Sequence, residues 1–195
     1  VTGVQTCALP IYGLIGDLLD LASVEAGDFH LDKRIVGFDE VVQKVLPRMK
    51  MISEMKEVGL DLAIEPNLPQ VDIDVNRIVQ VLSNLLRSTF KHSSRGGRVT
   101  FTVLRKGPVL DVRMTQAGHG FTPDQLSKLF IWTERRYVPG QSSHDGLRVG
   151  LAIARDILSA HKGQLGVESD GVDKGCTFWI QLPIHSEKPQ TKQGE

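Results

Sequence analysis

The sequence is short of the features that mark several large classes of protein. No apolar run among its 195 residues approaches the ~20 residues that a membrane-spanning helix needs. Basic and acidic residues both number 23, so no excess positive charge suggests binding to nucleic acid or to an anionic membrane. The two cysteines, Cys7 and Cys176, provide neither a disulfide framework nor metal-ligand spacing. These absences favour a cytoplasmic protein kept under reducing conditions.

What is present is typical of a globular protein with alternating helices and strands. Hydrophobic residues make up 41% of the chain, which is enough apolar surface for a buried core. Asp74 is expected to cap a helix, Gly27 to end one, and Pro47 to kink a third or start a new turn. Apolar periodicity predicts helices over 13–26, 38–57, 75–92, 125–130 and 149–161, and strands around 29–35 and over 60–64, 71–73, 98–105, 109–115, 164–169 and 176–182. This order predicts an α+β fold, a two-layer sandwich with one mixed sheet and helices on one face.

A two-glycine turn follows the strand predicted over 109–115. Residues 115–120 read Thr-Gln-Ala-Gly-His-Gly, with Gln116 ahead of Gly118 and Gly120. Glycine lets backbone come close to a ligand, although most such turns are ordinary. The turn therefore gains meaning only if neighbouring segments supply the rest of a nucleotide site.

A polar stripe runs along the helix predicted over 75–92. Gln80, Asn84 and Ser88 recur every four residues, and Lys91 follows three residues later. The solvated face of an amphipathic helix would give the same pattern. Amide oxygens followed by a lysine also suit a magnesium-bound triphosphate, because the oxygens can complete the metal's octahedron and the ammonium can meet phosphate charge.

Glycines also precede the helix predicted over 149–161. Residues 146–151 read Gly-Leu-Arg-Val-Gly-Leu, and the unpaired N–H groups at a helix start attract anions. Simple helix capping would use the same glycines. A further glycine turn, Gly175-Cys-Thr-Phe178, enters the last predicted strand and indicates little by itself.

Together these motifs resemble the N, G1, G2 and final glycine boxes of histidine-kinase catalytic domains, the Bergerat-fold (GHKL-type) ATPases. The matching motifs are Asn84-Leu-Leu, Gly118-x-Gly120, Gly146-x3-Gly150-Leu-Ala-Ile153, His161-x-Gly163 and Gly175-Cys-Thr-Phe178. The resemblance implies a catalytic domain over 28–184, after the end of a second dimerisation helix at 13–27 and before a disordered tail at 185–195. Residues 1–12 are expected to be an artefact, because 1–11 resemble a translated sequencing adapter.

The resemblance implies a two-component sensor kinase that binds ATP and magnesium beneath a lid at 131–147. None of the six histidines matches the phosphoacceptor, which is expected on an absent first dimerisation helix, so no catalytic residue is assigned. The implied partners are a second copy, through the upstream dimerisation helices, and a response-regulator receiver domain. Neither nucleic acid nor direct membrane contact is expected, and membrane anchoring of the parent protein stays open. The implied nucleotide-binding residues are Asn84, Ser88, Lys91, Gln116, Gly118, Gly120, Gly146, Arg148, Gly150, Leu151 and Thr177, with Asn84 and Ser88 as magnesium ligands.

Three positions and one segment depart from the family pattern. Gln116 replaces an aspartate that accepts the adenine amino group, Ser88 replaces a magnesium-binding asparagine, and Arg148 replaces a glycine. Residues 130–133 also depart from the usual lid anchor. Since a charge-assisted hydrogen bond contributes about 1.5–3 kcal/mol against about 1 for a neutral one, the change at 116 alone predicts roughly tenfold weaker binding. The pattern favours a divergent kinase or pseudokinase with weakened Mg-ATP binding. The alternative is an active domain that phosphorylates a histidine of the dimerisation helix.

Overall fold

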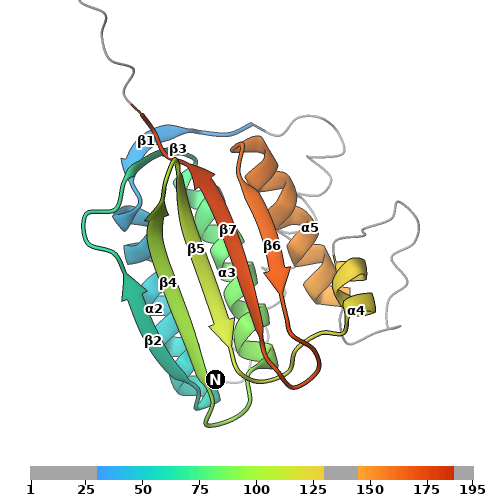
Figure 1. Cartoon of the computed structure of the whole chain (residues 1–195). Coiled ribbons are helices and arrows are strands. Elements are labelled where there is room, and N and C mark those ends of the chain that lie inside the picture. The colour runs from blue at the N-terminus through green and yellow to red at the C-terminus, as the bar shows by residue number, and fades with distance from the viewer. Residues whose placement is uncertain (1–29, 130–144, 187–195) are drawn as a thin grey trace, which may run out of the picture.

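The computed structural model describes residues 30–129 and 145–186, without the side chains of 145–149 (Figure 1). The expected artefact at 1–12, the helix predicted over 13–26, most of the predicted lid and the tail beyond 186 lie outside these residues. Within the described ranges, no helix is both long and apolar enough to cross a membrane.

A mixed five-stranded sheet forms one layer of the fold. Its strand order is β2-β4-β5-β7-β6, with β2 parallel to β4 and the other neighbours antiparallel. The strands are β2 (Gly59–Ile64), β4 (Arg98–Lys106), β5 (Val109–Gln116), β6 (Gln164–Glu168) and β7 (Cys176–Pro183). A separate two-stranded sheet pairs β1 (Arg34–Gly37) with β3 (Gln70–Ile73).

Three long helices form the second layer, all on one face of the sheet (Figure 1). They are α2 (Asp39–Lys56), α3 (Val75–His92) and α5 (Asp145–Ala160); a short helix, α4 (Pro123–Leu129), follows β5. The central helix α3 packs against both α2 and α5. This arrangement confirms the predicted α+β sandwich with helices on one face.

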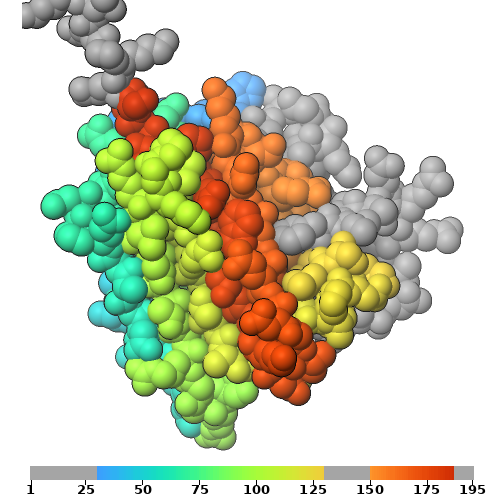
Figure 2. Space-filling model, viewed as in Figure 1, coloured from blue at the N-terminus to red at the C-terminus, as the bar shows by residue number. Residues whose placement is uncertain are grey.

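Strand alternation decides which side chains enter the core. In β5 the buried residues Leu110, Val112 and Met114 face the helices, and the next position on that face is Gln116. The opposite face, which Figure 2 shows, carries partly exposed residues such as Thr102, Arg113 and Trp179. A predicted site residue in a strand therefore faces the helices only if it lies at one of the alternate positions that point to that side of the sheet.

Two helices begin earlier than predicted. α4 begins two residues earlier than predicted, because Thr122 and Gln125 form a capping box: the Thr122 N–H donates to Gln125 Oε1 and the Gln125 N–H donates to Thr122 Oγ1. α5 begins at Asp145, four residues before the predicted start, so the last three residues of the predicted lid are helical. α2 continues as one helix through Pro47.

Asp74 joins three segments at the start of α3. Its Oδ1 accepts the N–H groups of Asn76 and Arg77, which confirms the predicted N-cap. Its Oδ2 accepts the N–H of Asp32, just before β1. Its own N–H donates to Nε2 of His161, 2.9 Å away at the end of α5. Because Nε2 accepts this bond, the His161 proton is on Nδ1, which donates to the Ile157 carbonyl.

Acidification should weaken the fold through His161. Burial lowers the pKa of this histidine, and the charge of Lys33 lowers it further, against raising contributions from Ile157, Asp74 and Asp72. The unfolded chain, with a histidine pKa of about 6.5, therefore takes up the proton more readily than the folded chain. We expect the contribution of neutral His161 to the free energy of unfolding to be fully present above about pH 6.5 and to be lost as the pH falls below that value. Urea unfolding between about pH 7.5 and 5.5 measures this loss, and His161→Gln, a neutral acceptor, should flatten it.

Candidate functional site

The polar stripe of α3 lies against the beginning of α5. A Cβ added at Gly150 would lie 3.6 Å from Asn84 Cβ and 3.7 Å from Asn84 Nδ2, so the two helices approach closely at this point. One turn further along α3, the Ser88 side chain is 5% exposed. Among the residues that the structure describes, neither Asn84 Nδ2 nor Ser88 Oγ has a hydrogen-bond partner, although both atoms are buried. Since buried polar atoms are nearly always paired, this is a place where a ligand oxygen would complete the hydrogen bonding.

Gln116 lies at the other end of the site, on the helix-facing side of β5. It is 2% exposed, and both N–H groups and one oxygen lone pair of its carboxamide bond within the protein. Nε2 donates to the His119 carbonyl at 2.5 Å and to the Cys176 sulfur at 3.3 Å. Oε1 accepts the N–H of Gly118. The side chain thus holds together the turn that follows it.

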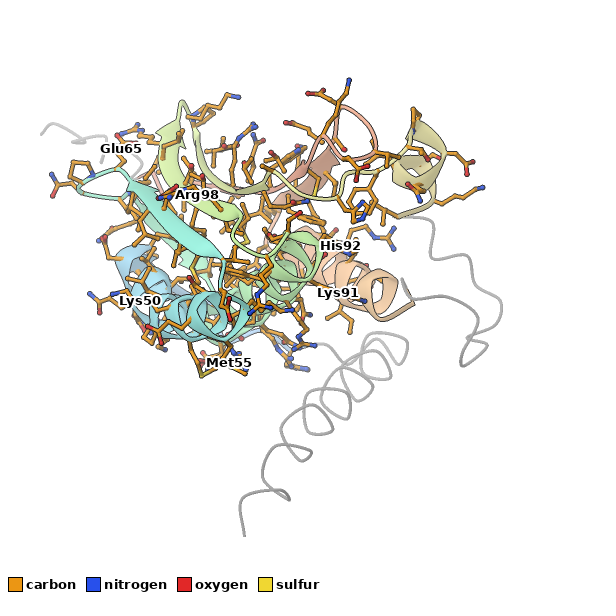
Figure 3. The ribbon with its side chains drawn as sticks, turned by 90° about the horizontal axis from the view of Figure 1, so that it is seen from below. Lys50, Met55, Glu65, Lys91, His92 and Arg98 are labelled. Carbon is orange, nitrogen blue, oxygen red and sulfur yellow. The ribbon has the colours of Figure 1, made fainter. Side chains whose placement is uncertain are left out.

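Gly118 and Gly120 bring backbone close to other backbone. A Cβ at Gly118 would lie 2.5 Å from the His92 carbonyl at the end of α3, and one at Gly120 would lie 2.0 Å from the Gly171 carbonyl. The loop is further held by hydrogen bonds from the His119 N–H to the His92 carbonyl and from the Gly175 N–H to the Gly118 carbonyl. Figure 3 looks toward this end of α3, where Lys91 and His92 are labelled. The close approach expected toward a ligand is, in the structure, an approach to the chain's own turns.

Cys176 is a site residue that sequence analysis missed, and it stands where Thr177 was expected. Gln116 is paired with Cys176 in the β5–β7 register, and both side chains face the helices. Thr177 is one position further, so its hydroxyl lies on the opposite face of the sheet and bonds to that of Thr115 at 2.9 Å. The structure therefore does not bring Thr177 to the site. Alternation along 176–182 was the signal that could have identified Cys176.

The remaining predicted residues lie in different surroundings. Leu151 is buried in the core, Lys91 is an exposed residue in the last turn of α3, and Gly150 contacts Asn84 as described. Gly146 and Arg148 lie in the first turn of α5, where the structure describes no side chains. The structure thus groups Asn84, Ser88 and Gly150 at one end and Gln116 with Gly118 at the other.

Comparison with known proteins identifies the family. The model of the histidine kinase-, DNA gyrase B- and HSP90-like ATPase family matches residues 73–186. The chain belongs to this family. Histidine protein kinase DivJ of Caulobacter vibrioides is 29% identical over 171 residues, covering 88% of this chain and 28% of DivJ. The adaptive-response sensory kinase SasA of Synechococcus elongatus is 28% identical over 173 residues, covering 88% of this chain and 44% of SasA. The chain therefore spans less than half the length of these relatives.

Solved histidine kinases share the fold of this ATPase-family domain. Acinetobacter baumannii AdeS matches with a TM-score of 0.70 and 20% identity, over 93% of this chain and 82% of AdeS. Full-length ShkA, solved in complex with AMPPNP, matches with a TM-score of 0.77 and 24% identity, over 95% of this chain and 38% of ShkA. Identities this low establish the fold alone.

The ATPase family binds ATP and magnesium. The two ends of the candidate site differ in how well they suit these ligands. At the α3–α5 end, Asn84 Nδ2 and Ser88 Oγ, which have no hydrogen-bond partner among the described residues, would donate to phosphate oxygens. Magnesium would instead take the oxygen atoms of these two side chains. Among residues 30–129 and 145–186, no group of three His, Cys, Asp or Glu residues could hold a metal. At the β5 end, Gln116 offers no charge. Burial raises the pKa of the neighbouring Cys176 thiol, which therefore stays neutral as well.

Replacing Ser88 with alanine should stabilise the unliganded ATPase domain while weakening its binding of Mg-nucleotide. The substitution removes a buried hydroxyl that has no partner in the described part of the chain, and relieving one unpaired group is worth about 1 kcal/mol. Urea unfolding and Mg-ATP titration of the same preparation measure the two effects. Thr89→Ala is the matched control, because the Thr89 hydroxyl donates to the Leu85 carbonyl and its loss should not stabilise the fold. Equal responses of the two variants would contradict the assignment of Ser88 to a ligand.

Proposed function

We propose that this chain is the ATP-binding region of a two-component sensor histidine kinase, in a divergent or pseudokinase form with weakened Mg-ATP binding. It transmits signal through its contacts with dimerisation helices more than through phosphotransfer. Its partners under this proposal are a second copy, joined through those upstream helices, and the receiver domain of a response regulator. The family match and the similarity to DivJ and SasA support the kinase part of the proposal.

The observation that supports weakened binding is that the Gln116 side chain is uncharged and already hydrogen-bonded within the protein. The resemblance assigns this position to the adenine amino group, for which a carboxylate provides a charged acceptor. The carboxamide is uncharged, and its polar atoms already bond to Gly118, His119 and Cys176. A ligand at this position would gain at most a neutral hydrogen bond, of about 1 kcal/mol.

An active kinase domain, which phosphorylates a histidine of a dimerisation helix, is the second candidate. The buried Asn84 and Ser88 atoms favour it, because they have no partner among the described residues and would be costly to keep without a ligand. ShkA, which shares the fold, was solved with the ATP analogue AMPPNP. The two candidates differ in the affinity for Mg-ATP and in phosphotransfer, so experiment can separate them.

Thermal unfolding during an Mg-ATP titration tests the proposal. A ligand at ~100 times its Kd stabilises the folded state by ~2.7 kcal/mol. We expect no magnesium-dependent shift at sub-millimolar Mg-ATP and a small shift only above that range. A clear sub-millimolar shift, together with transfer of labelled phosphate to a supplied dimerisation domain, would establish the active kinase and overturn the pseudokinase form.

A further inference from the structure

The two ends of the candidate site offer a ligand different chemistry. At the α3–α5 end, Asn84 Nδ2 and Ser88 Oγ are buried N–H and O–H donors that have no partner within residues 30–129 and 145–186. Donors of this kind suit the oxygens of an anion, and the beginning of α5 lies beside them. The hydrogen bonding of the protein is therefore incomplete at this end, and a phosphate group would complete it.

At the β5 end the N–H donors of Gln116 already have acceptors within the protein. Both N–H groups of the Gln116 carboxamide are in use, one on the His119 carbonyl and one on the Cys176 sulfur. The oxygen accepts the Gly118 N–H, so one uncharged lone pair remains. Rotating the carboxamide by a half turn would set its NH2 group against the Gly118 N–H. The orientation is thus fixed, and no donor can be turned toward a ligand.

Adenine and guanine differ in the group that such a position would contact. Adenine presents an amino donor where guanine presents a carbonyl acceptor. A carboxylate at position 116 would attract the amino group and repel the carbonyl. The fixed carboxamide offers guanine no donor and adenine only a neutral acceptor, whose bond is worth about 1 kcal/mol, or roughly a fivefold difference in Kd.

We propose that this domain holds Mg-nucleotides through their phosphates and discriminates little between adenine and guanine, with Gln116 as the residue that sets this low specificity. The inference rests on the proposed function, since it takes Asn84, Ser88 and Gln116 to line the nucleotide site. It concerns the ratio of two affinities, whereas the proposed function concerns their absolute size.

The test compares the full chain's binding of Mg-ATP, Mg-GTP and Mg-tripolyphosphate, by calorimetry or thermal shift. We expect the two nucleotide Kd values to agree within about fivefold, and tripolyphosphate to compete with both. Gln116→Asp should raise the preference for ATP above about tenfold by tightening ATP alone. Thr102→Val, on the open face of the sheet, is the control and should leave the ratio unchanged.

Each outcome bears on the inference. An ATP preference above about tenfold in the parent chain, or a ratio unmoved by Gln116→Asp, would overturn it. Failure of tripolyphosphate and of both nucleotides to bind at about 10 mM would also overturn it, and would leave the pseudokinase proposal standing. Sub-millimolar binding of ATP and GTP alike would support the inference and overturn the weakened-binding proposal instead.

Discussion

A chain carrying both Gln116→Asp and Ser88→Asn should bind Mg-ATP on the order of a hundredfold more tightly than the parent chain. The aspartate replaces a neutral acceptor by a charged one, which is worth roughly tenfold. The asparagine is longer than Ser88 and adds an amide oxygen one turn after Asn84, where the unpartnered atoms already lie. Calorimetric titration with and without magnesium measures the gain and its dependence on the metal.

The unliganded double variant should at the same time be less stable than the parent chain. A carboxylate at position 116 would be buried, and it could no longer donate to His119 or Cys176. The two single variants separate the contributions. Gln116→Asp should strengthen the contact with the adenine base, and Ser88→Asn should increase the magnesium dependence of binding. If neither variant tightens binding, the defect lies elsewhere, and Arg148→Gly becomes the next substitution to measure.

Gly120→Ala should destabilise the fold by about 3 kcal/mol, near the upper range for a single methyl group. The added carbon would lie 2.0 Å from the Gly171 carbonyl oxygen and 2.6 Å from that of Gly175. Both obstacles are backbone atoms, which cannot move aside as a side chain can. The β6–β7 loop and the segment leading into α4 lie side by side at this point (Figure 2), so the clash would separate them.

Gly37→Ala is the matched control for Gly120→Ala. Its added carbon would meet only Asp39 Oδ2, at an ordinary contact distance of 3.6 Å. We expect its free energy of unfolding, measured in urea, to stay within about 1 kcal/mol of the parent value. An equally small change at Gly120 would mean that the loop can rearrange around the new methyl group.

The sequence was sufficient to predict the architecture because periodicity and local caps determine it. The sequence of α3 has strong apolar periodicity, and Asp74 marks the start of the helix, so both ends of α3 were predicted correctly. The hairpin of β4 and β5 was predicted within one residue of each boundary. α4 was less well predicted, since its start depends on the reciprocal bonds of Thr122 and Gln125, a local signal that apolar periodicity does not contain.

The site was predicted less completely, because its chemistry depends on partners distant in sequence. That Gln116 bonds to Cys176, 60 residues away, follows only from the pairing of β5 with β7. The same pairing sends Thr177 to the other face, a one-residue difference that a motif match does not resolve. The need for glycine at 120 likewise comes from carbonyls of a loop about fifty residues later in the chain.

The position of β2 and α2 has a practical consequence for recombinant work. The family match begins at residue 73, yet β2 completes the sheet beside β4, and α2 covers α3, with Arg48 bonded to Ser83. A protein cut at that boundary would lose Phe38, Val45 and Met49 from the continuous core and leave β4 as an unprotected edge. The unit that folds is therefore larger than the unit that sequence families recognise, and expression should begin before Asp32, whose N–H bonds to the cap of α3.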